Sequence, residues 1–76
     1  MPGRRLPSVR PREVVRVLEK AGFEFLRSRG SHRSYGKEGI DETVVVPMHR
    51  KDIKPGTLRN ILRNAHLTRQ EFLDLL

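Results

Sequence analysis

The sequence predicts an α+β fold in which three antiparallel strands form one sheet and helices cover one of its faces. Two observations predict it. Apolar residues recur at helical spacing towards both ends of the chain. Three short β-favouring runs, separated by turns that contain glycine, lie between them. A two-layer arrangement suits this order of elements, and it leaves the other face of the sheet open to a partner or a substrate.

The first helix is predicted over residues 11–21. Pro11 suits a first helical turn, and Glu13 lies where the helix dipole favours an anion. Gly22 supplies the left-handed residue that ends the helix. The apolar stripe at helical spacing consists of Val14, Val15, Leu18 and Ala21.

Three strands are predicted in the middle of the chain. The first covers residues 23–28, which are rich in aromatic and apolar side chains and too few for a helix. Residues 29–31 turn the chain into a second strand over 32–37. A polar connection at 36–41 leads to the third strand, 43–46, whose three consecutive valines strongly favour β structure.

Two helices are predicted after a basic loop, over residues 55–65 and 69–75. The longer one carries an apolar stripe of Leu58, Ile61, Leu62 and Ala65. Thr68 and Glu71 have the spacing of a capping box before the shorter one. His66 lies between them, where glycine often ends a helix, and we interpret it as structural.

The length of 76 residues allows a single domain, which we expect over residues 11–76. Residues 1–10 contain two prolines, three arginines and no apolar period, and we expect them to form a mobile basic arm. A core this small leaves little room for a deep pocket, so we expect no organic cofactor. Chemistry, if present, would take place in a surface groove with a large partner.

The charge balance favours a polyanionic partner. There are 16 lysine and arginine residues against nine acidic ones, and the formal net charge is +7. Nucleic acid and an acidic protein are the two plain explanations. A membrane is not expected, because the chain has no apolar run of about 18 residues and no amphipathic stretch of the membrane-surface type. The absence of cysteine excludes disulfides and thiolate chemistry and is typical of a reducing cytoplasm.

His32 is the candidate catalytic residue. The small residues Gly30 and Ser31 before it allow a polymer backbone to approach closely. Metal-independent RNA cleavage needs a base, an acid and cations that stabilise the charge on phosphorus, and a histidine serves either proton role near neutral pH. The cations expected around His32 are Arg27, Arg29 and Arg33. The alternative is a solvated histidine that helps to fix the turn.

His49 is the candidate for a second acid or base. If the second and third strands pair, residue 32 lies opposite residue 47 or 48, and His49 comes near His32. An ordinary loop histidine is the alternative. We expect no metal site, because no two histidines have the i, i+4 spacing of a helical metal site and no carboxylate is allied to them.

Further phosphate-binding residues are predicted around the second helix. Arg50, Lys51 and Lys54 precede its N-terminus, which is a favourable site for a phosphate. Arg59 and Arg63 share its polar face. A solvated, solubilising loop is the alternative. Ser31, Ser34 and Tyr35 are able to donate hydrogen bonds to phosphate or ribose, although we expect Tyr35 to fill the sheet face opposite His32.

Four blocks of sequence carry a resemblance to a known family. They are VVRVLEKAGF at 14–23, RGSH at 29–32, VVVPMH at 44–49 and KPGTLRNILR at 54–63. In this order they resemble the HicA-type toxins, also called YcfA-like proteins, which are the ribonuclease halves of toxin–antitoxin pairs. Only about the first ten residues lie outside the resemblance, and His66 departs from it, since the family usually has glycine there.

The resemblance implies a fold like that of double-stranded-RNA-binding domains, with His32 as the catalytic histidine. It also implies cleavage of mRNA, held off by a HicB-type antitoxin. We expect the chain to be monomeric when free and hetero-oligomeric with its antitoxin. Two other functions stay open at this point. One is a non-catalytic RNA-binding module of the same fold, and the other is a protein-interaction domain whose basic face meets an acidic partner.

Overall fold

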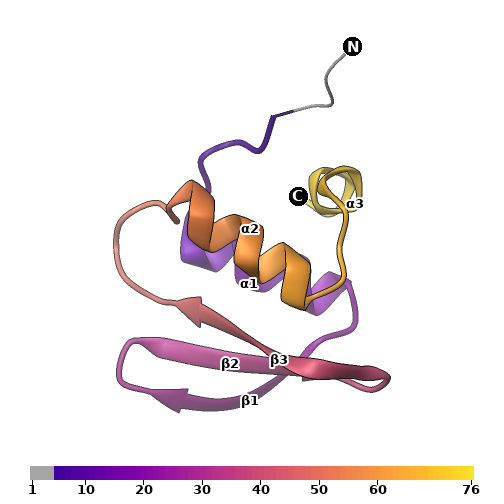
Figure 1. Ribbon diagram of the computed structural model, residues 1–76. Coiled ribbons are helices and arrows are strands. Elements are labelled where there is room, and N and C mark those ends of the chain that lie inside the picture. Colours follow the sequence, from indigo (N-terminus) through magenta and orange to yellow (C-terminus); the bar gives the residue numbers. More distant parts are fainter. Residues whose placement is uncertain (1–4) are drawn as a thin grey trace.

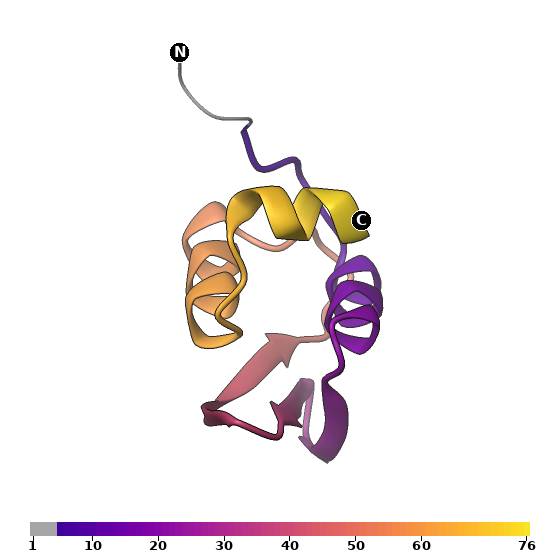
Figure 2. The same cartoon turned by 90° about the vertical axis from the view of Figure 1, so that its right-hand side faces the viewer.

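The computed structural model describes residues 5–76 and confirms the predicted α+β fold (Figure 1). The strands form one antiparallel sheet in the order β1-β2-β3. Helices α1 and α2 lie on one face of it, and α3 lies across both helices on the side away from the sheet, as in double-stranded-RNA-binding domains with a short added helix (Figure 2). The elements are α1 (Pro11–Lys20), β1 (Glu24–Arg29), β2 (His32–Lys37), β3 (Ile40–Pro47), α2 (Pro55–Asn64) and α3 (Arg69–Leu75).

The third strand is longer than the valine run predicts. It begins at Ile40, which pairs with Lys37, so only Glu38 and Gly39 remain in the connection. The sequence predicts a longer polar connection over 36–41, because its polar residues do not favour a strand. In the structure Lys37 pairs with Ile40 across a two-residue turn, and this pairing overrides the low β propensity of the segment.

The core lies between the sheet and the helices. At the end of β3 burial alternates: Val44 and Val46 are fully buried, whereas Val45 is 43% exposed on the other face. Phe72 of α3 is also fully buried and closes the core on the far side of α1 and α2. The other buried apolar side chains are Val9, Val14, Val15, Val17, Leu18, Phe23, Tyr35, Ile53, Leu58, Ile61, Leu62 and Ala65.

The packed part of the chain begins before Pro11. Val9 is 1% exposed, and its carbonyl accepts a hydrogen bond of 2.8 Å from the backbone N–H of Ile53. Arg10 Nε lies 3.1 Å from Asp52 Oδ1. The sequence predicts a mobile arm over residues 1–10, but Val9 and Arg10 are bound to the loop before α2. Residues 1–4 lie outside the described residues. A single valine among prolines and arginines has no period, so the sequence pattern does not reveal this contact.

The helix ends follow the predicted signals. Gly22 has a φ of +97° and ends α1. Thr68 and Glu71 form the predicted capping box, in which the Thr68 hydroxyl accepts from the N–H of Glu71 at 3.0 Å and the Glu71 carboxylate accepts from the N–H of Thr68 at 2.8 Å. His66 has a φ of +56°, and its Nε2 lies 2.8 Å from Glu42 Oε1 of β3. Its place and partner agree with the structural role predicted for it.

Substitutions at His66 separate the cost of the left-handed backbone from the value of the contact with Glu42. Both His66→Ala and His66→Gly lose the contact, but only glycine removes the left-handed penalty, which is about 1–2 kcal/mol for other residues. We expect His66→Gly to be the more stable of the two by about 1 kcal/mol, measured by urea unfolding. Equal midpoints would contradict a strained backbone at this position.

The same contact predicts a loss of stability in acid. The hydrogen bond from His66 lowers the pKa of the Glu42 carboxyl below its ordinary value of 4.5. A carboxyl with a lowered pKa stabilises the folded state above its unfolded pKa, and this contribution is lost as the pH falls through the folded pKa. Glu42→Gln should therefore show a smaller drop in urea midpoint than the wild type between about pH 5 and pH 3.

Glu38→Gln is the matched control, because Glu38 lies in the same hairpin and has no ion pair within residues 5–76. It should lose stability in acid as the wild type does. Equal drops in the two variants would show that the Glu42 carboxylate contributes nothing specific.

Candidate nucleic-acid interface

His32 lies at a corner of the sheet. It is the first residue of β2, where it pairs with Arg29 of β1 and Pro47 of β3, and it is exposed. The turn before it contains Gly30, whose φ is +57°, and nothing lies within 4 Å of where a Cβ would stand. Ser31 is also exposed. The imidazole therefore stands beside a turn with free space around its backbone, as the sequence predicts.

The strand register decides which arginines share a face with His32. Residues opposite one another in an antiparallel pair project on the same side. Arg29 lies opposite His32, and Arg27 lies opposite Ser34 two residues along, so both arginines lie on the face that the helices leave open. Successive residues of a strand alternate. Arg33 therefore projects on the helix side, opposite the buried Val46.

His49 and His32 line one groove. The N–H of Met48 donates a hydrogen bond to the carbonyl of Ser31, which holds the chain after β3 against the turn before β2. The groove has a volume of about 390 Å³. Its lining consists of His32, Val45, Pro47, His49, Lys54 and Thr57. The predicted approach of His49 to His32 rests on the pairing of residue 32 with residue 47, and that pairing is present.

The N-terminus of α2 forms the other wall of this groove. Lys54 is the N-cap residue, and its side chain makes no capping hydrogen bond. Pro55 occupies the first helical position, and the first turn carries no acidic residue. The backbone N–H groups of a first turn bear partial positive charge, and no side-chain cap occupies them here. The groove thus combines two imidazoles, an ammonium group and a helix N-terminus.

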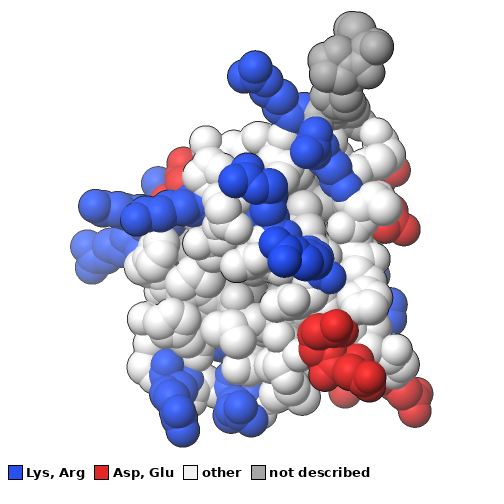
Figure 3. Space-filling view, in the orientation of Figure 1, with Lys and Arg blue, Asp and Glu red and all other residues white. Residues whose placement is uncertain are grey.

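The remaining predicted cations lie around the groove rather than in it. Arg59 and Arg63 are exposed on α2, and Lys51 is exposed in the loop before it. Figure 3 shows basic side chains over α2, along the β3–α2 loop and at the end of the sheet where β1 joins β2. Acidic side chains gather at the opposite end of the sheet, where the hairpin carries Glu38, Asp41 and Glu42 (Figure 3). The charge is therefore strongly asymmetric along the sheet.

The two other polar candidates on β2 are less accessible. Tyr35 is 1% exposed and packs edge-to-face against Phe25, with ring centroids 5.9 Å apart. It fills the helix-side face of the sheet, as expected. Ser34 shares the open face with His32 but is buried beneath its neighbours. Neither side chain is exposed as His32 is.

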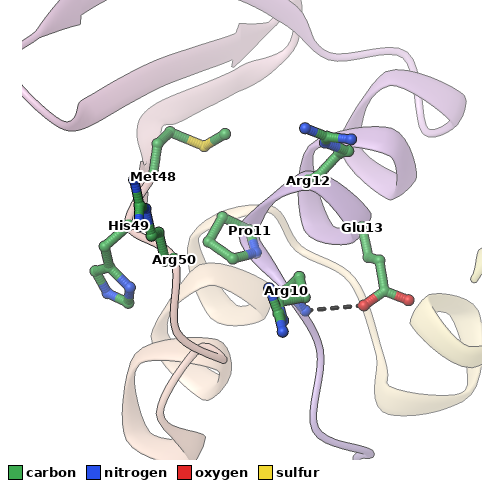
Figure 4. Close-up of a pocket in the computed structure, with 7 residues that line it drawn as sticks. All are labelled: Arg10, Pro11, Arg12, Glu13, Met48, His49 and Arg50. Carbon is green, nitrogen blue, oxygen red and sulfur yellow. Dashed lines mark hydrogen bonds between the residues drawn. The ribbon is translucent and has the colours of Figure 1, made fainter.

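The structure adds residues that the sequence pattern does not single out. Thr57, in the first turn of α2, lines the groove of His32. A second groove, of about 510 Å³, lies at the start of α1. It is lined by Arg10, Pro11, Arg12, Glu13, Met48, His49 and Arg50 (Figure 4). No spacing in the sequence relates α1 to the loop after β3, so only their packing reveals this groove.

Within residues 5–76 no group of three or more histidine, cysteine or acidic side chains is placed to hold a metal ion. No helix in this part of the chain is both long and apolar enough to cross a membrane.

A comparison with curated proteins gave no match for the chain. The family model described as the HicA toxin of bacterial toxin–antitoxin systems matches residues 11–67, which include α1, the whole sheet, both grooves' loops and α2. The match also spans the turn before His32 and the chain that carries His49. With the fold and most of the chain covered, this protein belongs to the HicA family, the toxins of bacterial toxin–antitoxin systems, and an antitoxin is its partner.

Proposed function

We propose that this toxin is an endoribonuclease that cleaves mRNA without a metal ion, with His32 as its catalytic residue. One observation carries the proposal. His32 and His49 line a single groove whose other wall is Lys54 and the uncapped first turn of α2. Cleavage of RNA by its own 2′-hydroxyl group requires two groups that transfer protons and a site that binds the phosphate.

The reaction begins at the ribose 2′-hydroxyl. One imidazole takes its proton as the 2′-oxygen forms a bond to the adjacent phosphorus. The bond from phosphorus to the 5′-oxygen breaks, and a second group gives that oxygen a proton. The products are a cyclic 2′,3′-phosphate and a 5′-hydroxyl. We assign His32 to one of the two proton roles, and His49 is the candidate for the other, because it is the second imidazole in the groove.

Cations stabilise the charge that develops on the phosphoryl oxygens. Lys54 and the first turn of α2 face the groove, and Arg29 lies directly across the strand pair from His32. Gly30 and Ser31 leave the protein backbone beside His32 accessible to the RNA strand. The outlying cations attract the RNA over a longer range. These are Arg27, Arg33, Arg50, Lys51, Arg59 and Arg63.

Removal of His32 tests the proposed mechanism. A general acid or base contributes about 10²–10⁴-fold to a rate, so His32→Ala should slow RNA cleavage by at least about 100-fold. The fold should persist, because the side chain is exposed. Cleavage is measured on purified protein in the presence of EDTA. His66→Gly is the matched control, because it removes a histidine far from the groove, and it should cut at the wild-type rate.

Undiminished cleavage by His32→Ala would overturn the mechanism. A second function, a non-catalytic RNA-binding module, is favoured by the exposed cations that extend beyond the groove. Tight binding that weakens steeply with salt, together with intact RNA after long incubation, would support that module instead.

The antitoxin is expected to act by covering the site. The open sheet face combines Arg27 and Arg29 with the exposed apolar side chains Leu26 and Val45, which suits an acidic protein with an apolar contact surface. Chemical modification of His32, mapped by mass spectrometry, should slow in the complex. His66, at the other end of the sheet, should react as it does in the free toxin. Equal reactivity of His32 in both states would exclude inhibition by occlusion.

A further inference from the structure

The second groove adjoins the first one at His49. That side chain belongs to the lining of both, and the two grooves together run from the His32 corner of the sheet to the start of α1. The hydrogen bond between Met48 and Ser31 fixes the segment of chain that separates them. A ligand long enough to extend from the first groove past His49 would therefore reach the second groove.

Two guanidinium groups are available in this second groove. Arg12 comes from α1 and Arg50 from the β3–α2 loop, and they lie on opposite sides of Pro11 (Figure 4). Both are exposed, and neither has an ion pair within residues 5–76. Arg10 differs, because its guanidinium is held by Asp52.

The one carboxylate in the lining is already engaged. Glu13 accepts a hydrogen bond of 2.9 Å from the backbone N–H of Arg10 and so closes the start of α1 (Figure 4). This contact also satisfies an N–H that would otherwise be free at that helix end. Glu13 keeps its negative charge, and the guanidinium groups without an ion pair in this lining are those of Arg12 and Arg50, so the lining remains net positive.

We propose that this second groove binds the RNA backbone on one side of the cleaved phosphate, with Arg12 and Arg50 pairing with phosphates beyond it. The proposal rests on the proposed function, since it takes the His32 groove as the place of cleavage. RNA is favoured over an acidic peptide because the groove continues the one that holds the reacting phosphate. Guanidinium groups also match phosphate oxygens in pairs of parallel hydrogen bonds.

The test measures the binding of RNA that cannot be cut. Oligonucleotides with 2′-O-methyl groups lack the nucleophile, and two lengths of about four and about twelve nucleotides distinguish one groove from two. Binding to the full chain is followed by fluorescence anisotropy over a range of salt. Arg12→Ala and Arg50→Ala should each reduce the salt slope of the longer RNA by about 0.7, the value for one phosphate contact on a single strand. Neither should alter binding of the shorter RNA.

Arg16→Ala is the matched control. Arg16 lies one turn further along α1, carries the same charge and lines a different hollow with Val17 and Leu75. It should bind both RNAs as the wild type does. The proposal is overturned if Arg12→Ala and Arg50→Ala retain the slope of Arg16→Ala. It is also overturned if they weaken only the antitoxin complex, which would assign the groove to a protein.

The two proposals fail in different ways. Undiminished cleavage of natural RNA by His32→Ala contradicts the proposed function, whereas an unchanged salt slope contradicts only the second groove. A wild-type protein that cleaves natural RNA but binds the longer oligonucleotide no more tightly than the shorter one would contradict only the second groove.

Discussion

The alternation of β3 is the constraint on which the rest of the structure depends. Val44 and Val46 enter the core and Val45 does not, so a register that is shifted by one residue would expose both buried valines. The register of β3 on β2 sets His32 opposite Pro47, and the pairing of β1 with β2 sets Arg29 opposite His32. A slip of one residue would turn the valines outward and break up the groove. The position of the candidate catalytic histidine is therefore a consequence of how the core packs.

The three helix starts differ in a way that bears on function. The start of α1 is closed by Glu13, and that of α3 by Thr68 and Glu71. The start of α2 has Lys54 and Pro55 and no side-chain cap. An uncapped start leaves backbone donors unsatisfied by protein. This helix end lies beside His32 and His49. Side chains accept hydrogen bonds from backbone N–H groups at the starts of the other two helices, whereas at the start of α2 a bound anion would be able to accept them.

Much of the fold could be predicted from local signals. Helical spacing of apolar residues, proline at the first helical turn and the capping box of Thr68 place the helices to within a residue. The position of His49 beside His32 followed from the pairing of two strands. The face of Arg33 was also open to prediction, since neighbours in a strand point to opposite sides, but proximity in sequence suggested a ring of three arginines around His32.

What the sequence did not reveal depends on contacts between distant segments. The residues on either side of Val9 are polar, and Val9 is buried where its backbone carbonyl accepts a hydrogen bond from the N–H of Ile53. In the sequence Arg12 is one of several charged residues on a predicted helix. Its place in a groove depends on the packing of α1 against the chain that follows β3. Local patterns report which side chains a segment turns inward. They do not report which other segment it meets.

The separation of charge along the sheet has a consequence for how the toxin would meet the RNA that we propose as its substrate. The hairpin of Glu38, Asp41 and Glu42 repels a polyanion while the opposite end attracts it, so an approaching strand exerts a torque on the molecule. Rotation during such an encounter would turn the histidine end of the sheet towards the RNA before contact is made. The acidic hairpin thus orients the collision without touching the ligand, and added salt shortens the distance over which this orientation begins.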